Sequence, residues 1–534
     1  MNHHRLSKPG PAVFLLLSLL LGSAGGAANL PLPAAESTST ITGRDLKTHL
    51  SFLASDELGG RFTLSPSSRI AARYLASQLE SYGYRGVARD GSFFQKVPLS
   101  YRNVDERNSH ASISGSGPKQ RFGYAAGFAV ETPEDISFSG DLVFVSYGIA
   151  SPMNRHDDYA GLNVRNKVVV AIEGVPESLK GLRLGADEQV ERAARSRGAA
   201  GVIKIPDAQV LITWSEVMSL LASQQQLGLP PRPSASGRVL PVVTAGPDLI
   251  RALARAMGKE SAADLTSTAA RHLRPALIPA SAEVRLRVDV KEAPPAQNVV
   301  GILEGADPRL KDEYVVFSAH YDHLKTSDNG EIYNGADDDG SGTVSVLEIA
   351  QAFSVGPRPR RSILVIFHTA EELGLFGSEF NTDYEPVVPL EKLVANFNID
   401  MIGRSRPDGD TDVRNRSLTD KDSLYVIGAD KLSSELNQLN EQTNLETVRM
   451  RFDYTYNDER HPERFYYRSD HYNYAKHGIP VIFYFTGVHR DYHRTTDDVE
   501  KIDFAKMERI SRMIFATGWR VANLDHRIVV DKKH

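Results

Sequence analysis

The chain has 534 residues, of which 41% are hydrophobic and 24% are charged, and its formal net charge is −5. This composition predicts an ordinary globular protein with two or three domains, and the lack of a basic excess argues against nucleic acid or an anionic membrane surface as a partner. Cysteine is absent, which excludes disulfides, thiol nucleophiles and cysteine-ligated zinc.

The first residues have the pattern of a cleaved secretory signal. Arg5 and Lys8 give a positive start, residues 12–21 form an apolar run, and small residues follow up to residue 28. Because this run is too short to span a bilayer comfortably, we expect residues 1–28 to be a signal peptide, with an uncleaved anchor as the alternative. We therefore expect an exported bacterial protein, periplasmic or extracellular, with no membrane attachment after signal cleavage.

Two helices and then a β-rich region follow along the chain. Residues 44–58 have an amphipathic helical pattern, and a second helix is expected from Ser67 or Ser68 to Gly83. From about residue 141, short β-type runs surround one helical pattern at residues 185–196. This region predicts an α+β module inserted into a larger domain.

The sequence changes character again from residue 298. Near-continuous apolar runs cover residues 314–319, 362–370, 396–402, 423–429 and 480–486, with helical patterns such as residues 343–353 between them. Strands that are buried on both faces and alternate with helices indicate an α/β fold with a mostly parallel central sheet flanked by helices.

Polar side chains gather where these apolar runs end. In open α/β sheets, ligands bind beyond the carboxyl ends of the strands. The residues found there are, in chain order, His320, the cluster Asp337–Asp339, Glu371 and Glu372, Asp400, and His489, Tyr492 and His493. One such motif alone is compatible with a solvated acidic loop, but the convergence of several strand ends predicts a metal site.

This mixture of imidazoles and carboxylates suits two divalent ions, most plausibly zinc. Two ions that share a bridging carboxylate and take two terminal ligands each need five protein ligands, and a further carboxylate must stay unligated as the general base. Adjacent residues at a strand end point in different directions, so Glu371 and Glu372 can divide these two roles. Residues i and i+2 share a face, so Asp322 can support the ring of His320.

Six motifs in order resemble the di-zinc exopeptidase family, which includes bacterial leucyl and double-zinc aminopeptidases, glutamate carboxypeptidases and the transferrin receptor. The motifs are "AHYDH", "NGADDDGSGT", "TAEELGLFGS", "NIDMIG", "RSDHYNYAKHGIPVIFYFTG" and "DYHRTTDDVEKID". The likeness covers residues 42–130 and 285–525, and the segment 131–284 resembles a protease-associated domain inserted into a zinc exopeptidase fold.

The resemblance implies a role for each site residue. His320 and Asp400 would hold one zinc ion, Glu372 and His493 would hold the other, and Asp338 would bridge the two.

Three further residues complete the implied site. Glu371 would be the general base, Tyr492 would stabilise the oxyanion, and Asp322 would act as a supporting residue. The chain departs from the family's "YHxPxDT" stretch at Thr495 and Asp498, which concerns the shape of the loop rather than the ligand.

Other polar residues of these motifs are not expected to be ligands. Asp337 and Asp339 are expected to be structural, because aspartates just before a helix readily cap it. His323 and His489 are expected to make rim or substrate contacts, and Asp470 and His471 are expected to line the pocket or support the site, without a catalytic role.

The function that the resemblance implies is a secreted zinc-dependent exopeptidase acting on peptides, first of all an aminopeptidase. The alternatives are a carboxypeptidase or dipeptidase of the glutamate carboxypeptidase type, a single-zinc glutaminyl cyclase, and a non-catalytic module like the transferrin receptor. The complete ligand set argues against the last of these, and the bridging aspartate argues against a single zinc.

Overall fold

The computed structural model of the protein describes residues 30–532, except 131–133, 180–188, 207–213, 215–217, 219–226, 231–239, 267–272, 459–460 and 462. The expected signal peptide, residues 1–28, lies outside the described residues. None of the helices within the described ranges combines the length and the apolar character that a membrane span needs.

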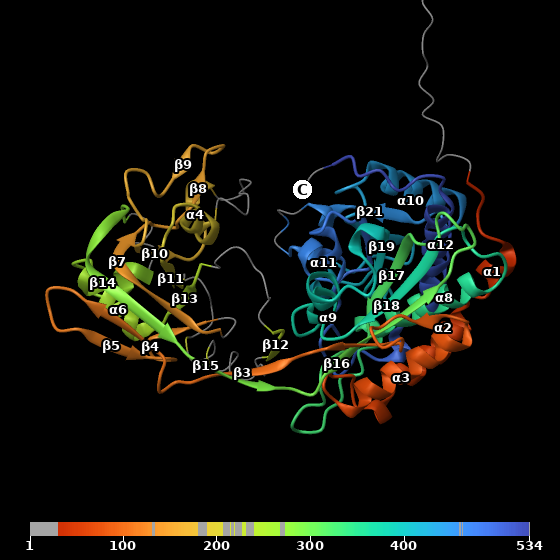
Figure 1. The fold of residues 1–534 in the computed structure, drawn as a ribbon, viewed down its shortest axis with the longest axis horizontal. Helices are drawn as coiled ribbons and strands as arrows, with labels where there is room; N and C mark the ends of the chain where they lie inside the picture. Colours follow the sequence, from red (N-terminus) through yellow and green to blue (C-terminus); the bar gives the residue numbers. More distant parts are fainter. Residues whose placement is uncertain are drawn as a thin grey trace, which may run out of the picture.

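A nine-stranded sheet forms the centre of the larger lobe (Figure 1). In spatial order its strands are β1 (Arg85–Gly86), β16 (Ala296–Leu303), β18 (Ser362–His368), β17 (Tyr314–His320), β19 (Leu393–Ile399), β22 (Val481–Phe485), β20 (Ser423–Ile427) and β21 (Arg451–Asp453), and β2 (Phe94–Val97) also pairs with β16. All five apolar runs of the sequence therefore form strands of one sheet.

The middle of this sheet is parallel, as expected. Strands β18, β17, β19 and β22 run parallel to one another. Antiparallel pairs lie outside this group, where β16 pairs with β18 and β20 pairs with β22. Strands β20 and β21 at the edge of the sheet are also parallel to each other. The α/β class is confirmed, and the strands whose ends carry the predicted site belong to the central parallel group.

Helices cover both faces of the nine-stranded sheet. Along β17, Val315, Phe317 and Ala319 pack into one core with helices of the first face, whereas Val316 packs into a second core on the opposite face. This alternation follows from the two-residue period of a strand. The α-helices among the described residues are α1 (Ala35–Ser39), α2 (Gly43–Leu53), α3 (Pro66–Ser81), α4 (Val190–Ser196), α6 (Pro247–Ala256), α7 (Ala263–Thr266), α8 (Gly342–Ser354), α9 (Phe376–Glu379), α10 (Ser434–Glu446), α11 (His471–Ala475) and α12 (Phe504–Asn523).

Both predicted N-terminal helices are present, with shifted ends. Helix α2 begins after Thr42, whose side chain accepts a hydrogen bond from the backbone N–H of Asp45. Helix α3 is capped by Ser65, not by Ser67 or Ser68, because Pro66 occupies the first helical position. Helix α8 starts at Gly342 and covers the expected 343–353 helix.

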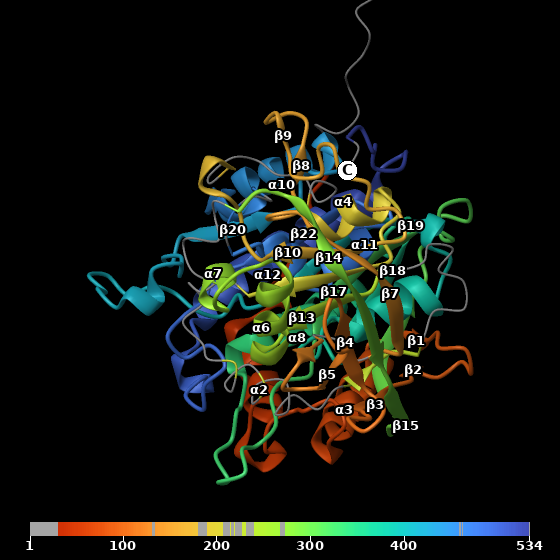
Figure 2. The same ribbon diagram turned by 90° about the vertical axis from the view of Figure 1, so that its left-hand side faces the viewer.

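A second, eight-stranded sheet forms the other lobe, which lies in front in Figure 2. Its strands in spatial order are β5 (Gln120–Gly123), β4 (His110–Ser114), β14 (Ala276–Leu286), β7 (Ile136–Phe144), β10 (Val168–Ile172), β11 (Gly201–Ile205), β13 (Val242–Ala245) and β6 (Phe128–Ala129). Because β4, β5 and β6 precede residue 130, this sheet extends beyond the expected boundary of the inserted segment.

A small sheet lies between the two lobes. Strand β3 (Ser100–Val104) pairs with β15 (Val288–Glu292) and with β12 (Leu227–Gly228), and these strands lie between the two larger sheets in Figure 1. Strands β8 (Ala150–Ser151) and β9 (His156–Asp157) form a separate hairpin-like pair. The chain therefore leaves the first lobe along β3 and returns to it along β15.

Candidate metal centre

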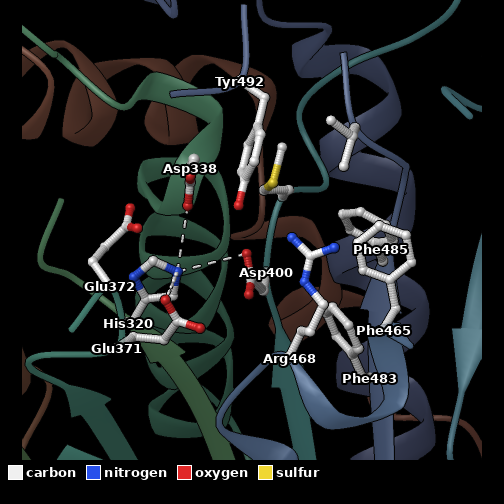
Figure 3. Close-up of a pocket in the computed structure, with 12 residues that line it drawn as sticks. His320, Asp338, Glu371, Glu372, Asp400, Phe465, Arg468, Phe483, Phe485 and Tyr492 are labelled. Atoms are coloured by element: carbon white, nitrogen blue, oxygen red, sulfur yellow. Dashed lines mark ion pairs between the residues drawn. The ribbon is translucent and has the colours of Figure 1, made fainter. Parts of the chain in front are cut away.

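The polar residues predicted at the strand ends meet at one edge of the nine-stranded sheet (Figure 3). His320 is the last residue of β17, Glu371 and Glu372 follow β18 after a short loop, and Asp400 directly follows β19. Tyr492 and His493 come from the loop after β22. Because parallel strands end at the same edge, residues more than 170 positions apart lie around one pocket.

Asp338 lies between two histidines, with one carboxylate oxygen toward each. Its Oδ1 atom is 3.5 Å from His320 Nε2, which is also 3.6 Å from Asp400 Oδ1. Its Oδ2 atom is 3.0 Å from His493 Nε2, which is 3.1 Å from Glu372 Oε2. The five residues thus form two groups of ligand-type atoms that share the Asp338 carboxylate.

These contacts fit metal ligands better than hydrogen bonds. Tetrahedral zinc with ligand bonds of about 2.0–2.1 Å separates its ligand atoms by about 3.3 Å. Among the described residues, Asp338 Oδ2 and His493 Nε2 have no hydrogen-bond partner although both atoms are buried. Two buried polar atoms 3.0 Å apart without hydrogen-bond geometry are costly unless a third group binds both.

The electrostatics of the cluster favour positive charge. Burial opposes the charged form of His320, yet Glu371 and Asp400 raise its pKa well above the ordinary value. Burial likewise opposes the charge on His493, while Asp338 and Glu372 raise its pKa to about 10. Burial opposes ionisation of Asp338, but His320 and His493 hold the pKa of its carboxyl well below the usual range. The residues present therefore fit a cationic metal centre.

Three non-glycine residues near the site have a left-handed backbone. The φ angles are 57° at Ala370, 56° at Met401 and 54° at His493. Such residues are uncommon, and they persist where surrounding contacts fix them. Met401 is fixed because its N–H donates to Asp339 Oδ1 (3.1 Å) and its carbonyl accepts from the N–H of Thr486 (2.9 Å).

Asp339 is a structural acceptor, in agreement with the expectation from its place before a helix. Its Oδ1 accepts from the N–H of Gly342, the first residue of α8 (2.8 Å), and from that of Met401, and its Oδ2 accepts from the N–H of His320 (3.2 Å). Although Asp339 lies close enough to His320 and Asp400 for a metal-binding group, these three N–H groups occupy its oxygens. Asp338, whose Oδ2 atom has no hydrogen-bond partner among the described residues, is therefore the better candidate ligand.

Asp337 and His489 also lie outside the ligand groups. Asp337 Oδ1 accepts from the N–H of Gly403 (2.6 Å), and its Oδ2 lies 3.1 Å from His489 Nε2. Each side chain thus has a protein partner, which agrees with the expectation that His489 is not a ligand.

His323 lies nearer the cluster than its expected place at the rim. It is fully buried, and its Nδ1 atom forms a 2.7 Å hydrogen bond with Glu372 Oε1. The same atom is 3.8 Å from Asp338 Oδ2. Because the contact with Glu372 has hydrogen-bond geometry, we interpret His323 as the group that orients Glu372. The second carboxylate oxygen of Glu372 then faces His493.

Glu371 is buried beside the cluster but outside the two ligand groups. Its Oε2 atom is 3.7 Å from His320 Nε2. Burial is the largest cause that raises the pKa of its carboxyl well above the ordinary value, with further contributions from Asp400 and Glu372. A carboxylate that gains a proton readily and lies next to a metal centre has the properties of a general base.

Asp322 supports Glu371 as well as His320. The ring of His320 meets the backbone carbonyl of Asp322 through Nδ1 at 3.2 Å, while the Asp322 carboxylate stands 3.8 Å away. That carboxylate accepts from the N–H of Glu371 (3.2 Å) and from the Thr63 hydroxyl (2.9 Å). The sequence predicted that the Asp322 carboxylate contacts the imidazole of His320, but the closer contact is with the Asp322 backbone carbonyl.

Several supporting residues escaped the sequence analysis. Buried Arg61 donates to the backbone carbonyls of Leu53, Tyr321, Asn334 and Gly335 and so fixes the loop that carries Asp338. Nothing in the pattern around Arg61 distinguishes it from a surface arginine, because its acceptors are backbone atoms distant in sequence.

Two other supporting residues belong to the sequence motifs that carry the candidate ligands. The Ser469 hydroxyl donates to Asp400 Oδ2 (2.7 Å), and Asp497 Oδ2 accepts from the N–H groups of Asp337 (3.0 Å) and Asp338 (3.1 Å). Their positions in "RSDH" and in "TTDD" could have suggested a role near the ligands.

Comparison with known proteins finds a family model that matches the part of the chain carrying this site. Residues 298–518 match the model described as peptidase family M28, and this range contains all five candidate ligands, Glu371 and Tyr492. "Aminopeptidase YwaD" of Bacillus subtilis is 36% identical over 110 residues, which is 21% of this chain and 22% of that protein. "Aminopeptidase NAALADL1" of Mus musculus is 37% identical over 131 residues, or 23% of this chain and 16% of that protein.

The chain thus matches about a fifth of the length of these curated relatives. Among solved structures, an aminopeptidase from Aneurinibacillus sp. strain AM-1 is similar over 93% of this chain and 98% of its own, with 18% sequence identity and a TM-score of 0.49. The similarity to peptidase family M28 covers residues 298–518, which is about two fifths of the chain.

Proposed function

We propose that the protein is a zinc-dependent exopeptidase that removes N-terminal residues from peptides and binds two zinc ions per chain. The observation that carries this proposal is the Asp338 carboxylate, whose two oxygens face two separate histidine–carboxylate pairs. His320 and Asp400 would hold one ion, and Glu372 and His493 would hold the other. Both relatives are named aminopeptidases, which supports cleavage at the N-terminal end of the peptide.

Zinc bound at such a centre supplies Lewis-acid chemistry, since it lowers the pKa of water and stabilises negative charge on a carbonyl oxygen. The side chains carry out the remaining steps. Glu371 accepts the proton of the attacking water and returns it to the leaving amine, a task that suits a buried carboxyl with a raised pKa. Asp322 and Thr63 position Glu371 through its own N–H and that of Ala370.

Tyr492 is the second group that faces the reacting carbonyl. Its hydroxyl points into the pocket beside Asp400 (Figure 3). Burial, with the nearby carboxylates of Asp338 and Glu372, raises the pKa of Tyr492 well above the ordinary value, so the phenol keeps its proton. It therefore donates a hydrogen bond to the oxyanion that forms when the peptide carbonyl is attacked.

The experiment that tests this function compares free and blocked amino termini. The zinc-loaded full chain is assayed on leucine 4-nitroanilide and on its N-acetyl derivative. We expect turnover of the free amine only, loss of turnover with a chelator and recovery with zinc. Hydrolysis of N-blocked peptides alone would overturn the aminopeptidase assignment in favour of a carboxypeptidase of the glutamate carboxypeptidase type.

We further propose that the eight-stranded lobe is an inserted protease-associated domain and that the chain is exported. The lobe has its own hydrophobic core, built from residues such as Leu142, Val170, Ile203 and Leu253. Strands β3 and β15 connect it at both ends to the rest of the chain, as expected for an insertion. Export is supported by the pattern of the first 28 residues.

A further inference from the structure

The pocket beside the metal centre has a mixed wall opposite the ligands. Phe465, Phe483, Phe485 and Val488 supply an apolar surface, and the guanidinium of Arg468 lies among them (Figure 3). A wall of aromatic and aliphatic groups alone would select apolar groups of a substrate. Arg468 adds a positive charge, and the proposed steps of hydrolysis do not use this charge.

Arg468 is held in place by stacking and has weak protein partners. Its guanidinium carbon lies 4.6 Å from the centre of the Phe465 ring, a cation–π contact that fixes its orientation. Among the described residues, its ion pair is with Glu463 at 3.6 Å, and both side chains are more than 40% exposed. An exposed pair at this distance contributes little.

Most hydrogen-bonding capacity of Arg468 remains for a ligand. Within the described part of the chain, its guanidinium donates one hydrogen bond, from Nη1 to the backbone carbonyl of Glu463 at 3.4 Å. A guanidinium has five N–H donors in a planar fork that matches the two oxygens of a carboxylate. The remaining donors are therefore suited to bind a carboxylate side-on.

The charge of Arg468 reaches the reaction site. Arg468 lines the same pocket as Tyr492 and the candidate ligands His320, Asp338, Glu372 and Asp400 (Figure 3). The four pocket carboxylates, which are Asp338, Glu371, Glu372 and Asp400, would be offset by two divalent cations. Arg468 then remains as a cation that faces the substrate, and the described residues that line the pocket offer it no further anion.

We propose that Arg468 is a specificity-determining residue that binds a carboxylate group of the substrate, so that the enzyme prefers peptides with such a group next to the scissile bond. The carboxylate comes either from an acidic N-terminal side chain or from the free C-terminus of a dipeptide. This inference rests on the proposed function, because it assumes that peptides occupy the pocket.

The test compares two pairs of substrates that differ by one charge. Asp-Ala-amide and Asn-Ala-amide differ in the N-terminal side chain, and Ala-Ala and Ala-Ala-amide differ in the C-terminal group. The ratio of kcat/KM within each pair is measured for the wild type, Arg468→Met and Arg468→Lys. Arg464→Met is the matched control, because Arg464 stacks on Tyr467 in the same loop and is not part of the pocket wall.

In Arg468→Met, the kcat/KM of the charged substrate relative to the uncharged one is expected to fall about tenfold for one of the two pairs. This is the effect of losing a charge-assisted hydrogen bond worth about 1.4 kcal/mol. Arg468→Lys should be intermediate, and Arg464→Met should match the wild type. The pair whose ratio falls identifies the source of the carboxylate. Ratios within about twofold of the wild type for both pairs in Arg468→Met would overturn the inference.

Binding measurements separate this inference from the proposed function. The same four peptides are titrated calorimetrically into zinc-loaded Glu371→Gln and into the double variant that also carries Arg468→Met. If the wild type hydrolyses none of the peptides, the proposed function fails. The ratio of dissociation constants within each pair then still decides whether Arg468 selects a carboxylate, with a change of about tenfold expected and no change contradicting it.

Discussion

Glu371 and Glu372 are neighbours in the chain with different surroundings. Glu372 receives a hydrogen bond from His323 on one oxygen and faces His493 with the other. Glu371 has its N–H fixed by Asp322, and its carboxylate lies beside His320 without joining either ligand group. This difference supports the proposal that Glu372 binds metal and Glu371 transfers the proton.

The separation of these roles predicts the behaviour of Glu371→Gln. Glutamine keeps the size of the side chain but cannot accept and return the proton, so kcat should fall by about 10²–10⁴-fold. The zinc content should stay at the wild-type value, because Glu371 is not among the proposed ligands. Glu372→Gln serves as the comparison and should lose zinc together with turnover. Near-normal turnover in Glu371→Gln would show that another group is the base.

At the scale of elements, the turn between Gly335 and α8 connects the candidate metal ligand Asp338 to the sheet. Asp339 binds three N–H groups, one each from β17, from the start of α8 and from the residue after Asp400. The turn is therefore a clamp that fixes the ends of β17 and β19 relative to Asp338.

Asp339→Asn tests this clamp. The amide nitrogen of asparagine would place a donor against one of the three N–H groups, which leaves a buried donor unsatisfied and should lower the free energy of unfolding by about 1–3 kcal/mol. Zinc affinity should fall as well, because the ligands lose their alignment. Chemical denaturation measures the first effect, with Asp328→Asn in the exposed part of the same loop as the control. Equal stabilities of the two variants would contradict the clamp.

Helix α12 contains a buried lysine that makes stability depend on pH. Lys506 Nζ donates to Thr419 Oγ1 (2.9 Å) and to the backbone carbonyls of Arg404 (3.0 Å) and Asp420 (2.7 Å). Burial is the main cause that lowers the pKa of Lys506 to about 8, although nearby aspartates oppose this shift. Its pKa in the unfolded chain is about 10.4.

Between these two values the unfolded chain binds the proton and the native state has lost it. The free energy of unfolding should therefore rise with pH above about 8, by up to about 1.4 kcal/mol per pH unit from this group. Lys506→Met should remove that slope, although it lowers stability overall because three acceptors lose their donor. The measurement is the difference in unfolding free energy between wild type and variant at several pH values. A difference that does not change with pH would contradict the shifted pKa.

At the scale of the whole molecule, the features that could be predicted from the sequence were those that depend on neighbouring residues, namely the strands and the residues at their ends. The apolar runs identified the strands β17, β18, β19, β20 and β22, and parallel strand ends brought residues from His320 to His493 to one edge. The contacts of Arg61 with four distant carbonyls could not be predicted, since backbone acceptors leave no mark in the sequence.

The extent of the second sheet was also beyond the sequence pattern. Strand β4 lies before the expected boundary at residue 130, yet it pairs with β14, whose residues are about 170 positions further along the chain. Pairing between strands so distant depends on the tertiary fold. The pattern of apolar residues identifies a strand but does not say which sheet the strand joins.

The proposed metal centre holds two zinc ions that share Asp338. The most direct measurement titrates zinc into metal-free protein while bound zinc and the hydrolysis of leucine 4-nitroanilide are followed together, with Asp338→Asn alongside. Two tightly bound ions per chain at full turnover, and loss of turnover with weakened zinc binding in Asp338→Asn, are the predicted results. Full turnover with one ion per chain, or unchanged zinc binding in Asp338→Asn, would contradict the account.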